Sequence, residues 1–168
     1  AVQALHANDV EVSMLTGDNT RTARALAGIA GIDDVRAELR PEDKASIVAE
    51  FSSKTPTAMI GDGINDAPAL AGATVGIAMG ATGSDAAIDS ADVAFTGHDL
   101  RLIPQALQHA RRGSRIINQN IVLSLAIIIV LMPLAISGVL GLAAVVLVHE
   151  VAEVIVILNG LRAAQAKR

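Results

Sequence analysis

The 168-residue chain contains no cysteine, tryptophan or tyrosine, and only two phenylalanines. The absence of cysteine excludes disulfides and thiolate metal ligands within these residues. Charged residues make up 18% of the sequence and hydrophobic residues 52%, and the mean hydropathy is +0.50. A wholly soluble domain is not expected to be this apolar. We therefore expect part of the chain to lie in a membrane.

The apolar residues are concentrated between Ile116 and Leu161, where Ser137-Gly138 and Gly141 form a turn-like interruption. Two stretches of about 20 residues result, and each is long enough to span a bilayer as a helix. The sequence therefore predicts transmembrane helices over about 116–136 and 140–161. A buried soluble hairpin is the alternative, but helices this long and apolar on all sides need a larger soluble core to cover them.

Charge differs between the two parts of the chain. Residues 1–110 hold 7 Lys and Arg against 15 Asp and Glu, a balance of −8, whereas residues 111–168 hold 6 against 2, a balance of +4. Basic residues flank the apolar run on both sides, so the positive-inside rule places both hairpin ends in the cytoplasm. The acidic first part argues against nucleic-acid binding. The two predicted spans indicate a multi-pass membrane protein. The chain is also rich in Ala and Val and poor in Lys, which is typical of a GC-rich bacterial genome, so we expect the membrane to be a bacterial plasma membrane.

The first 110 residues alternate between short apolar segments and helical patterns. Strands are expected at 10–15, 35–38, 57–60, 75–79 and 93–95, and helices at 21–30, 41–51, 65–71 and 84–90. This alternation predicts an α/β fold, with a parallel sheet covered by helices. A long helix from about Asp99 is expected to continue through Arg112 into the first span. We therefore place a soluble domain at 1–110 and a membrane hairpin with a short cytoplasmic tail at 111–168.

Residues 59–70 read MIGDGINDAPAL and carry the strongest functional signal in the chain. Asp62, Asn65 and Asp66 gather where the predicted strand ends, and an open parallel sheet binds its ligands at that edge. Gly61 and Gly63 permit a tight turn. Two carboxylates and an amide beside a helix N-terminus suit Mg²⁺ and a phosphate group. The alternative is an ordinary strand-to-helix turn, which needs only one or two of these residues.

Two other polar features are expected at the same edge of the sheet. The tripeptide Thr16-Gly17-Asp18 follows the first strand, where a hydroxyl and backbone amides can bind a phosphoryl oxygen. It is otherwise a plain turn in which Asn19 or Thr20 caps the next helix. Lys44, in the helix predicted at 41–51, can direct a positive charge at the phosphate; the alternative is a lysine on a solvated helix face.

The second predicted span contains three ionisable residues, His149, Glu150 and Glu153. Counting about 1.5 Å per residue from a start near Leu140 puts His149 about 14 Å deep, close to the bilayer midplane. Ionisable groups at that depth are costly and are usually functional. His149 and Glu153 lie one helical turn apart, and an imidazole with a carboxylate suits Zn²⁺, Co²⁺, Ni²⁺ or Cd²⁺. The alternative is a His–Glu pair that locks helices together or relays protons.

Taken together, these features resemble the carboxyl-terminal part of a heavy-metal-translocating P-type ATPase. The resemblance covers essentially the whole chain and rests on TGDN at 16–19, PEDK at 41–44, MIGDGINDAPAL at 59–70 and a hairpin ending in LNGLR at 158–162. It implies a haloacid-dehalogenase-like (Rossmann-like) phosphorylation domain and in-line phosphoryl transfer from ATP to an aspartate.

The resemblance also implies roles for all candidate residues of the soluble part except Asp18. Thr16, Gly17 and Lys44 would hold the phosphoryl group. Asp62 would bind Mg²⁺, and Asn65 with Asp66 would complete its surroundings.

The family pattern is incomplete in this chain. The family nucleophile lies in an Asp-Lys-Thr-Gly-Thr segment, which does not occur in these 168 residues. The ATP-binding domain, the actuator domain and the earlier membrane helices are also missing, so we expect them, with the lipid bilayer, as partners. A fragment of this kind is expected to be inactive alone. Two alternatives remain open: a membrane-tethered haloacid-dehalogenase-type phosphatase and a noncatalytic regulatory partner of a pump.

The second span also bears on which ion is carried. In the cobalt-like subclass of the family this helix contains a His-Glu-Gly-Gly-Thr-like motif, and His149 and Glu150 match its first two positions. The zinc and lead type has a Lys in the first span and an Asp in the second, and neither is present here. The resemblance therefore implies a pump that exports Zn, Cd, Co or Ni and leaves the choice among them open.

Overall fold

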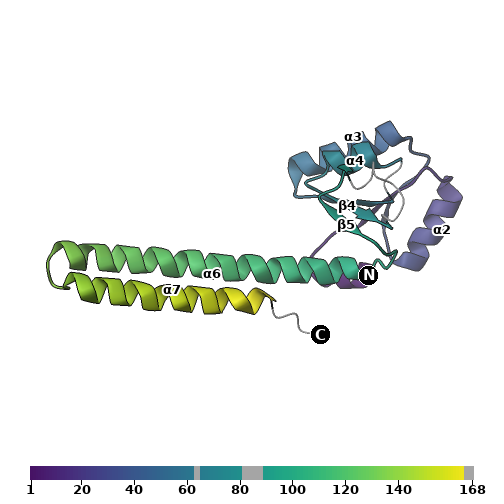
Figure 1. Ribbon diagram of the computed structural model, residues 1–168. Coiled ribbons are helices and arrows are strands. Elements are labelled where there is room, and N and C mark those ends of the chain that lie inside the picture. Colours follow the sequence, from purple (N-terminus) through teal and green to yellow (C-terminus); the bar gives the residue numbers. More distant parts are fainter. Residues whose placement is uncertain (63–64, 81–88, 165–168) are drawn as a thin grey trace. The chain divides into compact units, whose positions relative to one another are not determined.

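The computed structural model describes residues 1–62, 65–80 and 89–164. It divides into two compact units, Ala1–Leu102 and Ile103–Arg168. The first unit is α/β and the second is a pair of long helices (Figure 1). The boundary predicted at residue 110 falls inside the first of these long helices.

The first unit contains the alternating elements that the sequence predicts. Its helices are α1 (Val2–His6), α2 (Thr20–Ala30), α3 (Pro41–Lys54) and α4 (Ala67–Gly72), and its strands are β1 (Ser13–Leu15), β2 (Asp34–Arg36), β3 (Ala58–Gly61), β4 (Val75–Met79) and β5 (Val93–Phe95). Each predicted strand is found, although β1 and β2 are shorter than predicted. The sequence did not predict α1, and most of the helix predicted at 84–90 lies outside the described residues.

The strands form two parallel ladders rather than the single sheet that the sequence predicts. In the first ladder β1 pairs with β2, with Leu15 opposite Arg36. In the second, β4 lies between β3 and β5, with Gly61 opposite Ala78. The parallel direction agrees with the α/β prediction, because parallel neighbours need a crossover connection, and α2 and α4 supply it between β1 and β2 and between β3 and β4.

Side chains join the two ladders where backbone hydrogen bonds do not. The core is a cluster of four buried apolar side chains from α3, β3 and α4, namely Val48, Met59, Ala69 and Leu70. Leu15, the last residue of β1, packs against this cluster. The guanidinium group of Arg36 in β2 lies 4.7 Å from the ring centroid of Phe51 in α3. Helix α3 is therefore the common packing partner of both ladders.

Helix α4 approaches β4 very closely. An added Cβ on Gly76 would lie 2.7 Å from the backbone oxygen of Leu70. Helices α3 and α4 lie next to each other (Figure 1), and Leu70 is only 1% exposed. Because α4 directly follows the turn after β3, the absence of a side chain at Gly76 fixes how closely that turn can approach the sheet.

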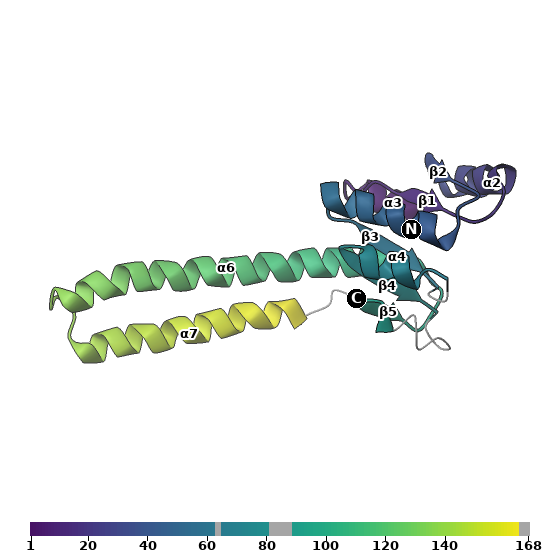
Figure 2. The same ribbon diagram turned by 90° about the horizontal axis from the view of Figure 1, so that it is seen from above.

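The second unit is an antiparallel hairpin of α6 (Leu102–Ile136) and α7 (Leu142–Ala164), which run side by side in Figures 1 and 2. Their most apolar 18-residue windows have mean hydropathies of 2.3 and 2.1, and only 6% of each window is buried. Apolar surface exposed along both helices fits lipid contact and not the alternative of a buried soluble hairpin. At 1.5 Å per residue α6 is about 52 Å long, well beyond the ~30 Å hydrocarbon core. This continuous helix agrees with the long helix predicted from about Asp99 through Arg112 into the first span.

The two helices of the hairpin are tied together at both ends. At one end the chain turns at Gly138, whose φ of 73° lies in the left-handed region that favours glycine. Near the other end, Nδ2 of Asn159 donates to Oδ1 of Asn120 at 2.8 Å. Nδ2 of Asn120 in turn donates to the backbone oxygen of Val156 at 3.3 Å.

The contact between α4 and β4 predicts that Gly76→Ala destabilises the chain by about 1–3 kcal/mol, the usual cost of overpacking, because a backbone oxygen cannot move aside. Gly28→Ala in α2 is the matched control. Nothing lies within 4 Å of the Cβ position of Gly28, so alanine there should stabilise the helix by about 0.5–1 kcal/mol. Thermal unfolding of the chain in detergent measures both. A Gly76→Ala variant as stable as wild type would contradict the close approach.

Candidate functional site

The candidate site begins where β3 ends. Met59 anchors this strand in the core, with only 8% of the residue exposed, and Gly61 is the last residue of the strand. Asp62 follows directly and is exposed. Its side chain makes no hydrogen bond or ion pair with the residues that the structure describes. Its carboxylate oxygens are therefore open to a ligand at the carboxyl end of a parallel strand.

Lys44 and Asp66 form a part-buried ion pair across α3 and the turn after β3. Nζ of Lys44 lies 2.8 Å from Oδ1 of Asp66, and the two side chains are 16% and 13% exposed. Lys44 therefore does not lie on a solvated helix face. Water screens this pair less than it screens an exposed one, and removal of either partner would leave the other charge poorly compensated.

Gly61 allows this ion pair to sit against the strand. An added Cβ on Gly61 would lie 2.8 Å from Oδ2 of Asp66 and 3.0 Å from its Cβ. The carboxylate of Asp66 thus packs on the backbone of the last residue of β3. As a result the ammonium group of Lys44 is held, through Asp66, near Gly61, the residue that precedes Asp62.

The remaining residues of the MIGDGINDAPAL motif contribute less to the described geometry. Asn65 is exposed in a turn, and α4 begins at Ala67 rather than near Asn65. The backbone oxygen of Asp66 accepts a hydrogen bond from the amide of Leu70 at 2.8 Å, which closes the first turn of α4. Gly63 lies outside the described residues.

The Thr16-Gly17-Asp18 loop is held by its own side chains. Oγ1 of Thr16 accepts a hydrogen bond from the amide of Asp18 at 3.1 Å and donates one to Oδ2 of Asp18 at 3.1 Å. Asn19 caps α2, accepting from the amide of Thr22 at 3.0 Å. The capping alternative is therefore correct for Asn19. It leaves the backbone amide of Gly17 as a candidate phosphate ligand, because the cap does not use that group.

A neighbouring segment braces this loop, and the sequence analysis did not identify it. The amide of Glu38 donates to the backbone oxygen of Asp18 at 2.9 Å, and the amide of Leu39 donates to that of Thr16 at 3.1 Å. Oε1 of Glu38 accepts from the amide and hydroxyl of Thr20 at 3.2 and 3.0 Å. Glu38 has a φ of 59°, which a glutamate rarely adopts. No local sequence pattern signals such a residue.

The structure brings some of the predicted site residues together and not others. Lys44, Asp66 and the backbone before Asp62 form one contiguous group. No hydrogen bond or ion pair links the loop at 16–18 to residues 61, 62, 65 or 66 in the described part of the chain. Leu15, which precedes Thr16, does pack against the core cluster that contains Met59. This packing places the last residue of β1 and an inner residue of β3 on the same buried cluster.

The three ionisable residues of the second span, His149, Glu150 and Glu153, lie on α7 and are all exposed. Because α7 begins at Leu142 rather than near Leu140, His149 is about 10 Å from the start of the helix and not 14 Å. Within the described ranges, no group of three or more His, Cys, Asp or Glu residues could hold a metal ion. The hairpin alone therefore does not assemble a complete ion site.

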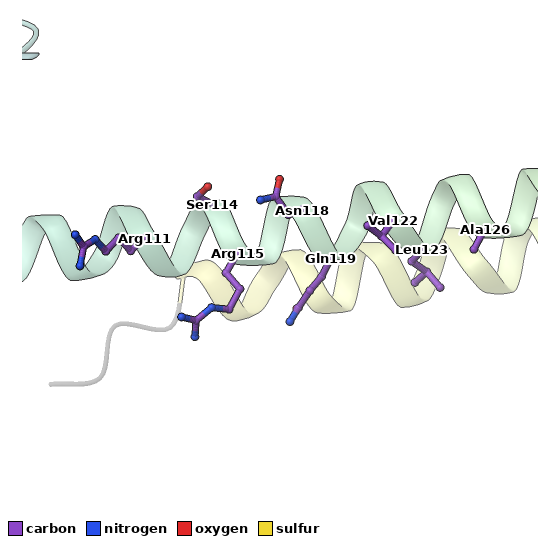
Figure 3. Close-up of a pocket in the computed structure, with 8 residues that line it drawn as sticks. All are labelled: Arg111, Ser114, Arg115, Asn118, Gln119, Val122, Leu123 and Ala126. Carbon is purple, nitrogen blue, oxygen red and sulfur yellow. The ribbon is translucent and has the colours of Figure 1, made fainter. Parts of the chain in front are cut away.

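A shallow groove runs along one face of α6 and contains none of the predicted site residues (Figure 3). Arg111 and Arg115 lie toward one end of it, and Val122 and Ala126 lie toward the other. This change from basic to apolar side chains along a helix is typical of the boundary between aqueous and lipid surroundings. It supports a membrane boundary on α6 between Arg115 and Val122.

Comparisons with known proteins agree with this architecture. Residues 1–74 match the model of the haloacid dehalogenase-like hydrolase family. The chain is 64% identical over 166 residues to the probable cation-transporting ATPase G of Mycobacterium tuberculosis, which covers 99% of this chain and 22% of that protein. It is 43% identical over 168 residues to a cadmium-transporting ATPase of Staphylococcus aureus, covering 99% of this chain and 23% of that protein.

A solved structure is similar over nearly the whole chain. The crystal structure of a zinc-transporting PIB-type ATPase in the E2.Pi state matches with a TM-score of 0.91 and 41% sequence identity. The match covers 98% of this chain and 27% of that one. The chain thus spans about a quarter of the length of the relatives it matches. It therefore belongs to the heavy-metal-transporting P-type ATPases and corresponds to a carboxyl-terminal part of such a pump.

Proposed function

We propose that this chain is part of an ATP-driven pump that exports a divalent heavy-metal ion, Zn, Cd, Co or Ni, through an aspartyl-phosphate intermediate. The observation that carries this proposal is the Lys44–Asp66 ion pair, which holds a positive charge at the end of β3 beside Asp62. A fixed cation and an open carboxylate at one strand end suit the binding and transfer of a phosphoryl group.

The nucleophilic aspartate of this reaction is supplied by the remainder of the pump. The sequence contains no Asp-Lys-Thr-Gly-Thr segment, and the relatives are about four times longer than this chain. We therefore expect the 168 residues alone to be inactive. The ATP-binding domain, the actuator domain and the earlier membrane helices are its proposed partners within the complete protein.

In the phosphoryl site, this chain positions groups and neutralises charge. Lys44 places its ammonium group toward the phosphoryl oxygens, and Asp66 orients Lys44 through the 2.8 Å contact. Thr16 and Gly17 offer a hydroxyl and a backbone amide at the end of β1, where Asp18 holds the Thr16 hydroxyl. Charge-assisted hydrogen bonds of this kind are among the strong ones in proteins.

The donor set at the end of β3 fits Mg²⁺. This ion prefers oxygen ligands and commonly takes one or two carboxylates together with water and substrate phosphate oxygens. Asp62 is an exposed carboxylate that suits this role, whereas Asp66 already has one oxygen on Lys44. Asn65 contributes an amide to the surroundings. When bound, Mg²⁺ neutralises negative charge on the phosphoryl group.

The transported ion is proposed to contact His149, Glu150 and Glu153 on α7. An imidazole and carboxylates suit borderline divalent ions. The similarity to proteins named as cadmium-transporting and zinc-transporting supports a divalent cargo. Because these residues do not form a complete site within the hairpin, the other ligands are proposed to come from the remaining membrane helices of the pump.

The membrane and its sidedness complete the proposal. The hairpin crosses a bacterial plasma membrane, and both of its ends are cytoplasmic, because Arg111, Arg112 and Arg115 precede the first span and Arg162 follows the second. Both alternatives are weaker. A tethered phosphatase would need its own nucleophile, and a noncatalytic regulator would have no use for a part-buried cation at a phosphate site.

Asp62→Ala in the complete pump is expected to abolish phosphoenzyme formation from ATP, because the open carboxylate for Mg²⁺ is lost. Acid-stable labelling with radioactive ATP measures this. Asp33→Ala is the matched control, since Asp33 is exposed and precedes β2, at the amino end of a strand and not at the carboxyl end, and it should label normally. Normal labelling of the Asp62 variant would refute its assignment to the site.

Lys44→Ala is expected to slow phosphoenzyme formation roughly 100-fold, the usual cost of removing one electrostatic stabiliser from an active site. Lys54→Ala on the same helix is the control. Lys54 pairs with Glu50 at 2.6 Å on the surface, where its hydrogen bond holds the pKa of Glu50 below the ordinary value. Exposed pairs contribute little, so this variant should retain wild-type rates. Equal rates for both variants would exclude Lys44 from the reaction.

His149→Ala and Glu153→Ala in the complete pump are expected to reduce metal-stimulated ATP hydrolysis. Phosphorylation by inorganic phosphate in the reverse direction should persist, because the phosphoryl site is untouched. Hydrolysis assays over a panel of divalent metals, run alongside labelling from inorganic phosphate, separate the two effects. Unchanged metal activation in both variants would return these residues to the alternative of a structural His–Glu pair.

A further inference from the structure

The side-chain amide of Asn159 is fully engaged between the two membrane helices. Nδ2 donates to Oδ1 of Asn120 at 2.8 Å and to Oε1 of Gln119 at 3.4 Å, both on α6. Oδ1 accepts from a guanidinium nitrogen of Arg162 at 2.8 Å, one turn along α7. Nδ2 and Oδ1 of Asn159 therefore both have partners. The two contacts made by Nδ2 cross to α6, so they depend on the position of α7 relative to α6.

Few large apolar side chains of the described hairpin are buried, and Ile116 of α6 is one of them. Ala152 is the buried residue of α7 among those described, and an alanine offers no large side chain to interlock with α6. The rest of α7 is apolar on most sides, with a mean hydropathy of 2.1 in its central window. In lipid such surfaces have no hydrophobic preference for one register, so specificity must come from polar contacts and close packing.

We propose that Asn159 is a positioning residue that sets the axial register of α7 on α6. A slip of one turn, 5.4 Å, would break the contacts of Asn159 with Asn120 and Gln119. Asn120 strengthens the same register, because its own Nδ2 donates to the backbone oxygen of Val156. The register is thus defined by a side-chain pair and by a contact to the backbone.

This register matters for the ion site of the proposed function, on which the inference rests. His149 and Glu153 precede Asn159 on the same rigid helix, about 15 Å and 9 Å along its axis. The turn at Gly138 restrains the opposite end of α7. Asn159 therefore fixes the depth at which the ion-binding side chains stand beside α6, without contacting the ion itself.

The test uses the complete pump and three variants, Asn159→Ala, Asn120→Ala and the double variant. The readout is the concentration of Zn²⁺ or Cd²⁺ that gives half-maximal phosphoenzyme formation from ATP. Removing one interhelical hydrogen bond in a membrane is expected to raise that concentration roughly 3- to 20-fold. Both single variants break the Asn120–Asn159 contact, and each also removes one further interhelical contact, so the shift in the double variant should be smaller than the product of the two single shifts.

Gly160→Ala is the matched control on α7. Its added Cβ would lie 3.9 Å from Nδ2 of Asn120, an ordinary contact distance, so the metal dependence should stay that of wild type. Labelling from inorganic phosphate should be unchanged in every variant. A purely structural role would lower the amount of active pump and its thermal stability without moving the half-saturating metal concentration.

The outcomes separate the inference from the function on which it rests. A metal-dependent wild type whose half-saturating concentration does not change in Asn159→Ala or Asn120→Ala overturns the positioning role alone. Independent effects that multiply in the double variant overturn it as well. If Asn159→Ala does not accumulate in the membrane, Asn120→Ala removes the same hydrogen bond from the other helix and decides the question. A wild-type pump without metal-dependent phosphoenzyme overturns the proposed function and the inference together.

Discussion

The soluble unit depends on one part-buried ion pair, between Lys44 and Asp66, because it joins the helix before β3 to the turn after it. Asp66 can reach this position only because Gly61 has no side chain. The close approach of α4 to β4 at Gly76 also restrains Asp66, because α4 begins directly after it. Three features of the sequence, two glycines and one charge pair, therefore fix the ammonium group of Lys44 at the end of the strand that Asp62 follows.

The membrane hairpin is organised by the same kind of constraint. Its surfaces are apolar and its helices bury few side chains against each other, so a small number of polar contacts carries most of the specificity. Asn120 and Asn159 supply these contacts at one end, and the turn at Gly138 closes the other. His149 and Glu153 lie between the two restraints.

Local patterns predicted the α/β fold, the strand order along the chain and the two long apolar helices. They also predicted that Asp62 lies at a strand end and that Lys44 is a candidate site residue, because strand ends and turn residues are local signals. They could not predict that Asp66 pairs with Lys44, 22 residues away in sequence. The same holds for the brace by Glu38 and the Asn120–Asn159 contact, whose partners are 39 residues apart. Such contacts depend on tertiary packing, which a one-sequence pattern does not encode.

The most direct test of the account is metal-dependent phosphorylation of the complete pump. The purified protein would be incubated with radioactive ATP and Mg²⁺, with no added metal, with Zn²⁺, Cd²⁺, Co²⁺ or Ni²⁺, and with Cu⁺. The account predicts an acid-stable phosphoenzyme that accumulates with at least one of the four divalent ions and not with Cu⁺ or without metal. A phosphoenzyme that forms equally under all conditions, or with Cu⁺ alone, would contradict it.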